Sequence, residues 1–190
     1  MNEKLKVALI YGSNRPGRLC DKVASWAAVQ ISARPEFSLD VVDPASPEAR
    51  ATQSGESLNA EWLRKHIGDA DAFVVVTPEY NHGYPAALKS LIDSVGAEWH
   101  AKPVAFVSYG GMSGGIRAAE QLRQVFAEMH AVTIRDSVMF PMAWDQFDGN
   151  GKLFNADRAE RQMNTVLRRL AWWATALREA RNAAPYESAA

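Results

Sequence analysis

Five short apolar runs, rich in β-branched residues, recur along the chain with starts about 30 residues apart, the length of one strand and one helix. The runs occupy positions 7–11, 39–42, 72–76, 104–107 and 132–139. Those at 72–76 and 104–107 are apolar without alternation, which is typical of strands covered on both faces. The pattern therefore predicts an α/β fold with an open parallel sheet between helices. Residues 1–190 are expected to form a single domain.

Apolar residues at helical spacing predict the segments that connect these runs. Helices are expected at 19–31, 58–67, 85–95 and 114–129, with a last helix starting near Asp157. Ser113 is the predicted N-cap of the fourth helix. The segment 44–56, with its prolines, is expected to be a surface loop.

Composition and charge exclude several classes of partner. The formal net charge of −1 argues against a nucleic-acid or anionic-membrane surface. A single cysteine, Cys20, excludes an internal disulfide and fits a reducing compartment. No apolar run approaches the roughly 18 residues that a membrane helix needs. We therefore expect a cytoplasmic protein without nucleic-acid or membrane partners.

The first run leads into a glycine-containing loop, 12–18, and then into a helical pattern. A strand, a turn and a helix in this order direct backbone N–H groups and the positive end of a helix dipole at an anion. Ser13 adds a hydroxyl, and Arg15 and Arg18 each carry a guanidinium able to bind phosphate oxygens. The glycine spacings of P-loop and dinucleotide-binding turns do not occur here. The loop therefore predicts a site for a terminal phosphate, with an ordinary turn and two solvated arginines as the alternative.

Two further loops follow the third and fourth runs, and the parallel sheet would bring all three together beyond the carboxyl ends of its strands. The loop 77–85 carries two prolines and several aromatic or amide side chains, and 108–115 has four glycines in eight residues. Aromatic faces and closely approaching backbone suit a flat ligand. A flat molecule with a phosphate tail is predicted, and flavin mononucleotide (FMN) fits that description.

The segments 12–18, 78–89 and 108–111 resemble the NADPH-dependent FMN reductase family, and Pro-Glu-Tyr-Asn at 78–81 is the most specific match. The resemblance extends over nearly the whole chain, including 147–152 and the helix with Trp172 and Trp173. It implies a flavodoxin-like fold with five parallel strands in the order 2-1-3-4-5. The segment 148–151 is richer in glycine than the family pattern, a departure that concerns only local loop shape.

The resemblance also implies roles for individual residues. Those that would hold the FMN phosphate are Ser13, Arg15, Arg18, Leu19 and Cys20. Those that would edge the isoalloxazine ring, mostly through backbone groups, are Pro78, Glu79, Tyr80 and Asn81. Those that would face its pyrimidine side are Ser108, Tyr109, Gly110 and Gly111. No catalytic side chain is expected, because the cofactor performs the chemistry.

The implied activity is hydride transfer from NADPH or NADH, through FMN, to a small acceptor by a ping-pong mechanism. Quinones, azo dyes, nitroaromatics, metal oxyanions and free flavin all stay open as acceptors. So does the question whether FMN is tightly bound or exchanges as a substrate. A flavodoxin-type electron carrier is the alternative, although such carriers usually have a surface of one charge sign. A homodimer, or a tetramer of dimers, is expected from the resemblance and from Trp99, which lies in a polar linker and suggests an interface.

A hydrolase is a more remote alternative, because 111–115 matches the Gly-x-Ser-x-Gly pattern around Ser113. That reaction needs an aspartate and then a histidine later in the chain. His130 is the only histidine after Ser113, and it precedes Asp136, so the order fails. Cys20 is interpreted as a packing residue, and no metal is expected because the histidines lack ligand spacing.

Overall fold

The computed structural model describes residues 3–50 and 58–189 and confirms the predicted sheet. Its strands are parallel and run in the order β2-β1-β3-β4-β5. They are β1 (Leu5–Tyr11), β2 (Phe37–Val42), β3 (Ala72–Pro78), β4 (Pro103–Tyr109) and β5 (Val132–Phe140). Every residue of β3 and β4 is buried, as the unbroken apolar runs predict.

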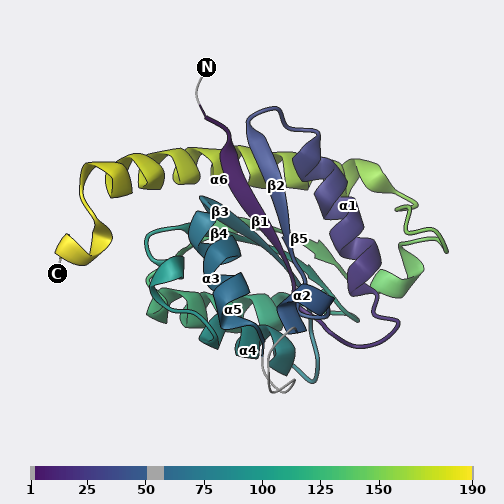
Figure 1. The fold of residues 1–190 in the computed structure, drawn as a ribbon. Coiled ribbons are helices and arrows are strands. Elements are labelled where there is room, and N and C mark those ends of the chain that lie inside the picture. Colours follow the sequence, from purple (N-terminus) through teal and green to yellow (C-terminus); the bar gives the residue numbers. More distant parts are fainter. Residues whose placement is uncertain (1–2, 51–57, 190) are drawn as a thin grey trace.

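Helices cover both faces of the sheet (Figure 1). One face packs against α1 (Cys20–Ser32) and α6 (Ala156–Ala183). The other packs against α3 (Ala60–Asp69), α4 (Ala86–Asp93) and α5 (Ile116–Glu128). Short helices complete the described elements: α2 (Pro47–Arg50), η1 (Ala97–Trp99), η2 (Ala143–Asp145) and η3 (Tyr186–Ala189). The arrangement makes two separate apolar cores, one on each side of the sheet.

The start of α5 differs from the prediction. The helix begins at Ile116, and its N-cap is Gly115 rather than Ser113. Gly115 has a φ of 84°, and a Cβ at this position would lie 2.7 Å from the backbone nitrogen of Tyr109. The chain is therefore forced through a tight turn that only glycine fits, and this turn delays the helix.

The segment 44–56 also departs from the predicted loop. Residues 47–50 form α2, and Ala49 is buried. The rest of that prediction, from residue 51 onward, lies outside the described residues.

Trp99 is a core residue, which overturns its assignment to an interface. The side chain is fully buried, and its indole nitrogen donates a hydrogen bond of 3.1 Å to the carbonyl of Ile92. Its ring packs edge-on against Phe73 and Phe126. The surrounding sequence is polar because η1 is a short surface helix that turns this single side chain inward. Trp99 thus gives no support for a dimer.

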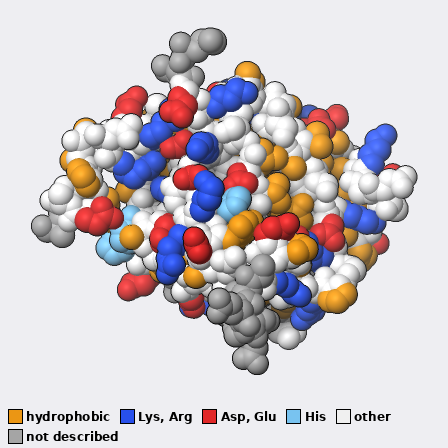
Figure 2. All heavy atoms as spheres, viewed as in Figure 1, with side chains coloured by type: hydrophobic (Ala, Val, Ile, Leu, Met, Phe, Trp, Pro, Cys, Tyr) orange, Lys and Arg blue, Asp and Glu red, His pale blue; other side chains and the backbone are white. Residues whose placement is uncertain are grey.

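The face of the molecule shown in Figure 2 carries basic and acidic side chains interspersed, in keeping with the net charge of −1. Among the described helices, none is both long enough and apolar enough to span a lipid bilayer.

Candidate cofactor site

The three predicted loops meet at the carboxyl edge of the sheet. Gly12 donates its N–H to the carbonyl of Val76 at 2.7 Å, and Glu79 donates its N–H to the carbonyl of Tyr109 at 3.1 Å. The hydroxyl groups of Ser13 and Tyr80 lie 2.9 Å apart. The first loop is thus bonded to the second, and the second to the third, as the parallel order predicts.

Gly12 allows the first of these contacts. A Cβ on this residue would lie 2.6 Å from the carbonyl oxygen of Val76, closer than real side chains approach. The absence of a side chain therefore lets the loop 12–18 pass directly over the end of β3.

Several backbone donors in these loops are free. Within the described residues, no hydrogen-bond acceptor meets the N–H groups of four residues around the start of α1, namely Asn14, Gly17, Leu19 and Cys20. The same holds for the N–H groups of three glycine-loop residues, Gly111, Met112 and Ser113. Unpaired N–H groups at the start of a helix form a ready binding site for an anion.

Arg15 extends from the first loop and stacks on an aromatic side chain of the second. Its guanidinium carbon lies 3.7 Å from the centroid of the Tyr80 ring, a cation–π contact. The side chain is exposed and forms no ion pair within residues 3–50 and 58–189. Arg15 can therefore bind a ligand placed between the first and second loops. To do so it would give up only its exposed contact with the Tyr80 ring.

Arg18 has a different environment. Its side chain is only 7% exposed and forms a two-point ion pair with Asp43. Its Nε also donates to Asp21 at 2.7 Å, and its Nη1 to the carbonyl of Ser13. Burial alone would lower its pKa, but the two carboxylates raise the pKa of Arg18 above its ordinary value. The predicted contact of Arg18 with phosphate stays a prediction, while its observed contacts hold the loop 12–18 against the end of β2.

Sequence reasoning missed Asp43, although a signal was present. Asp43 directly follows β2, so it lies at the same edge of the sheet as the loop 12–18. An acid at that position can pair with an arginine from the neighbouring β1 loop.

Leu19 and Cys20 form the start of α1. The Cys20 thiol is fully buried, and burial raises its pKa to about 11. This supports the interpretation of Cys20 as a packing residue, because a protonated buried thiol is a poor nucleophile. Within the described residues, the backbone N–H groups of Leu19 and Cys20 have no acceptor and are therefore available to a ligand.

The second loop combines buried and exposed residues. Pro78 is buried at the end of β3, whereas Asn81 and His82 are exposed and have positive φ angles of 49° and 70°. Left-handed geometry is tolerated by asparagine and histidine better than by most residues. The turn is closed by paired hydrogen bonds between Tyr80 and Gly83 at 2.9 and 3.0 Å.

Glu79 ties the second loop to α5. Its side chain is 6% exposed and accepts hydrogen bonds from the N–H of Arg117 at 3.1 Å and from Nη1 of Arg117 at 2.5 Å. Burial works to raise its pKa, but hydrogen bonds from Arg117 and Ser113 outweigh burial and hold the pKa of Glu79 below its ordinary value. Glu79 is therefore an ionised anchor within the site, a role that the sequence did not reveal.

The third loop presents backbone rather than side chains. Ser108 is fully buried and donates its hydroxyl hydrogen to the carbonyl of Gly114 at 2.8 Å. Tyr109 is buried in the core against α1 and α6, where burial raises its pKa above the ordinary value. The side chains of Ser108 and Tyr109 thus do not line the open face of the site. Gly110 and Gly111 are partly exposed and leave their backbone accessible.

The hydrolase alternative has no structural support. The Ser113 hydroxyl accepts a hydrogen bond from the N–H of Gly115 at 3.3 Å and donates to Glu79. His130 lies beyond the far end of α5, where its ring nitrogen is 2.9 Å from the hydroxyl of Tyr186. Ser113 therefore helps to position Glu79 and the start of α5, and the histidine that a nucleophilic serine would need lies at the opposite end of the sheet.

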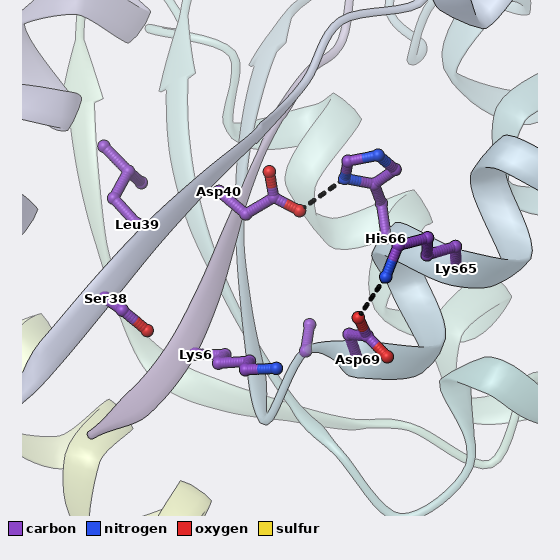
Figure 3. A pocket seen from close by; sticks show the side chains of 8 residues that line it. Lys6, Ser38, Leu39, Asp40, Lys65, His66 and Asp69 are labelled. Carbon is purple, nitrogen blue, oxygen red and sulfur yellow. Dashed lines mark hydrogen bonds and ion pairs between the residues drawn. The ribbon is translucent and has the colours of Figure 1, made fainter. Parts of the chain in front are cut away.

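A hollow of about 310 Å³ lies away from the three loops (Figure 3). It is placed near the amino ends of β1 and β2, beside the end of α3. Its charges are largely paired: His66 Nδ1 lies 2.6 Å from Asp40, and Lys65 donates to Asp69 at 2.9 Å. Because the ligand loops follow the carboxyl ends of the strands, this hollow is not part of the cofactor site. Across the described part of the chain, no group of three or more acidic, histidine or cysteine side chains could hold a metal ion.

Comparison with known proteins assigns the family. Residues 5–145 match the NADPH-dependent FMN reductase family. The chain belongs to this family. An NAD(P)H-dependent FMN reductase of Schizosaccharomyces pombe is 35% identical over 149 residues, covering 72% of this chain and 74% of the relative. One of Pseudomonas aeruginosa is 30% identical over 196 residues, covering 94% of this chain and the whole of the relative.

Two further comparisons agree with this assignment. A quinone reductase of Escherichia coli is 32% identical over 146 residues, covering 70% of this chain and 76% of the relative. The solved structure of the flavoenzyme NAD(P)H:(acceptor) oxidoreductase of Paracoccus denitrificans superposes with a TM-score of 0.66, covering 90% of this chain and 98% of that chain at 21% identity. The structural likeness shows the flavodoxin-like fold. As a member of the NADPH-dependent FMN reductase family, the protein is an oxidoreductase that uses FMN and NAD(P)H.

The residues at the loops fit the phosphate of FMN. The N–H groups of Asn14, Gly17, Leu19 and Cys20 and the guanidinium of Arg15, all without a hydrogen-bond or ion-pair partner among residues 3–50 and 58–189, supply donors and positive charge in one place. A phosphate monoester carries about −1.5 to −2 charges at neutral pH, so it would match both.

Proposed function

We propose that the loop 12–20 holds the phosphate of FMN and that the loops 78–82 and 108–113 border its ring system. The observation that carries the proposal is the set of unpaired N–H groups at the start of α1 beside Arg15. The free N–H groups of Gly111, Met112 and Ser113 would lie near the ring, where they can stabilise the negative charge that develops on reduced flavin.

When bound by these loops, FMN would supply the redox chemistry, namely the acceptance of hydride from NAD(P)H and the reduction of an acceptor. The chain's own residues bind and orient the reactants, and none is proposed to move a proton. We propose a quinone as the acceptor, supported by the related quinone reductase. Conversion to the hydroquinone consumes two electrons and two protons, one proton being drawn from solvent.

We further propose that NAD(P)H and the acceptor use the same open face in turn, which gives ping-pong kinetics. Initial rates at several fixed quinone concentrations should then give parallel double-reciprocal lines. Intersecting lines would show that both substrates bind together and would contradict the proposal.

Binding of FMN is tested first, by calorimetry with micromolar protein. Under anaerobic conditions, NADPH or NADH alone should then reduce the bound FMN and remove its yellow colour. A protein that binds FMN but needs a separate reductase would behave as an electron carrier.

A homodimer, with the pairing of dimers into a tetramer as the alternative, and a cytoplasmic location are also proposed. The family resemblance supports the dimer, and the single buried cysteine is compatible with a reducing compartment. Light scattering at micromolar concentration tests the assembly, and a compact monomer would contradict it.

A further inference from the structure

A groove with a volume of about 380 Å³ borders the glycine loop on the side toward α6. Its lining includes Met112, Met139, Pro141, Gln146, Arg158 and Gln162. We refer to it as the Met112 groove. It begins at Met112, directly after Gly111, so it adjoins the place where the cofactor ring is proposed to lie.

The side of the groove next to the glycine loop is apolar and accessible. Met112 is 92% exposed, an unusual state for a large apolar side chain, and Met139 is also exposed. The loop that presents Met112 is held in place, because Gly111 accepts hydrogen bonds from the N–H groups of Gly114 at 3.1 Å and Met142 at 2.9 Å. Met112 is thus an exposed apolar side chain carried by an anchored stretch of backbone. Methionine at such a surface suits flat apolar ligands of varied shape.

The side of the groove formed by α6 is polar and carries one cationic side chain, Arg158. Arg158 is exposed, and within the described residues it forms no ion pair or hydrogen bond. Most other arginines near the sheet edge are occupied, as Arg18 is by Asp43 and Arg117 by Glu79. Gln146 and Gln162 add neutral amide groups to the same lining.

We propose that the Met112 groove binds planar aromatic acceptors that carry an anionic substituent, with Met112 contacting the ring and Arg158 the anion. The proposal rests on the proposed function, because it concerns the acceptor of that same site. A single free cation matches one sulfonate or carboxylate group better than the several negative charges of a nicotinamide dinucleotide. Charge complementarity of this kind favours one acceptor over another of equal shape.

The test compares 1,4-naphthoquinone-2-sulfonate with 1,4-naphthoquinone, which share a ring system and differ in the anion. Arg158→Gln should raise the KM for the sulfonated quinone about 3- to 10-fold, because an exposed charged contact is weaker than a buried one. The KM values for naphthoquinone and for NADPH should not change. The dissociation constant of the sulfonated quinone from the FMN-loaded protein, measured by equilibrium dialysis without NADPH, should rise by the same factor.

Arg161→Gln is the matched control. Arg161 is also an exposed arginine near the start of α6, but it lines a different hollow between α1 and α6. It should leave both quinones unaffected. A third variant, Met112→Ser, should raise the KM equally for both quinones, since it removes an apolar contact and no charge.

Three results would overturn the proposal. If Arg158→Gln and Arg161→Gln raised the KM for the sulfonated quinone equally, the effect would be one of general charge. If Arg158→Gln raised the KM equally for both quinones, Arg158 would not contact the anion. A raised KM for NADPH would assign the groove to the dinucleotide. Failure of the proposed function is distinguishable, because a protein that reduces neither quinone can still be tested by equilibrium dialysis.

Discussion

The guanidinium of Arg15 stacks on the ring of Tyr80, with 3.7 Å between the guanidinium carbon and the ring centroid. The hydroxyl of Tyr80 in turn lies 2.9 Å from that of Ser13. One aromatic side chain of the second loop therefore contacts two residues of the first. This connection orders the proposed phosphate site through residues of the chain itself.

Replacing Arg15 should separate phosphate recognition from ring recognition. A hydrogen bond to a charged group contributes about 1.5–3 kcal/mol, so Arg15→Ala should lower the affinity for FMN about 10- to 100-fold. Riboflavin, which lacks the phosphate, should bind almost unchanged. Titrations of both flavins measure this, and the FMN effect should shrink at high salt. Equal losses for the two flavins would show that the loop is structural.

Replacing Arg18 should have a different result, because its side chain is largely occupied. Arg18→Ala leaves the Asp43 carboxylate without its partner and frees the loop 12–18 from the end of β2. The variant should lower the affinities for FMN and riboflavin by a similar factor, and it should lower the free energy of unfolding. A loss confined to FMN would instead make Arg18 a direct phosphate ligand.

The Arg18–Asp43 pair should contribute measurably to stability. Asp43→Asn should lower the free energy of unfolding by about 2–4 kcal/mol, because it leaves a buried guanidinium poorly paired. Asp21→Asn is the matched control, since Asp21 also contacts Arg18 but is 57% exposed. Its effect should stay below about 1 kcal/mol. Urea unfolding of the two variants checks this, and equal effects would contradict it.

Ser113→Ala should keep most of the NAD(P)H oxidation of the unchanged protein. The residue positions Glu79 and the start of α5, so its loss removes a supporting hydrogen bond and no reacting group. Steady-state rates and labelling by a fluorophosphonate test this together. Abolished turnover with labelling of Ser113 would revive the hydrolase.

Lys102 should make stability depend on pH. Its ammonium is buried and donates to the carbonyls of Ile67 at 2.8 Å and Gly68 at 2.7 Å, and burial lowers its pKa to about 8. An unfolded lysine titrates near 10.4, so between about pH 8 and 10.4 the unfolded chain binds the extra proton. The contribution of Lys102 to stability therefore rises with pH across that window.

The measurement is the free energy of unfolding at several pH values for the unchanged protein and for Lys102→Met. Cys20 has the opposite effect on the free energy of unfolding as the pH rises, because its raised pKa keeps a proton on the folded chain. The difference between the two curves removes that contribution. This difference should grow with pH from about 8 to 10.4, and a constant difference would show that Lys102 does not titrate there.

The sequence by itself determined the order of strands and helices along the chain and the meeting of three loops at one edge of the sheet. Unbroken apolar runs are typical of buried parallel strands, because such strands are covered on both faces. Parallel strands place the loops 12–18, 77–84 and 108–115 at one edge, which the contacts of Gly12 and Glu79 confirm. These features depend on local patterns and on general rules of topology, and both can be inferred from a single chain.

Only the tertiary structure decided which side chains are free to act. Arg15 and Arg18 look equivalent in the sequence. In the structure Arg18 forms an ion pair with Asp43, which lies 25 residues further along the chain, and Arg15 does not. Trp99 lies in a polar segment and is nevertheless a core residue, because the turn of η1 directs it between Phe73 and Phe126. Such pairings join positions distant in the chain, and their energies depend on burial and distance, which no local pattern records.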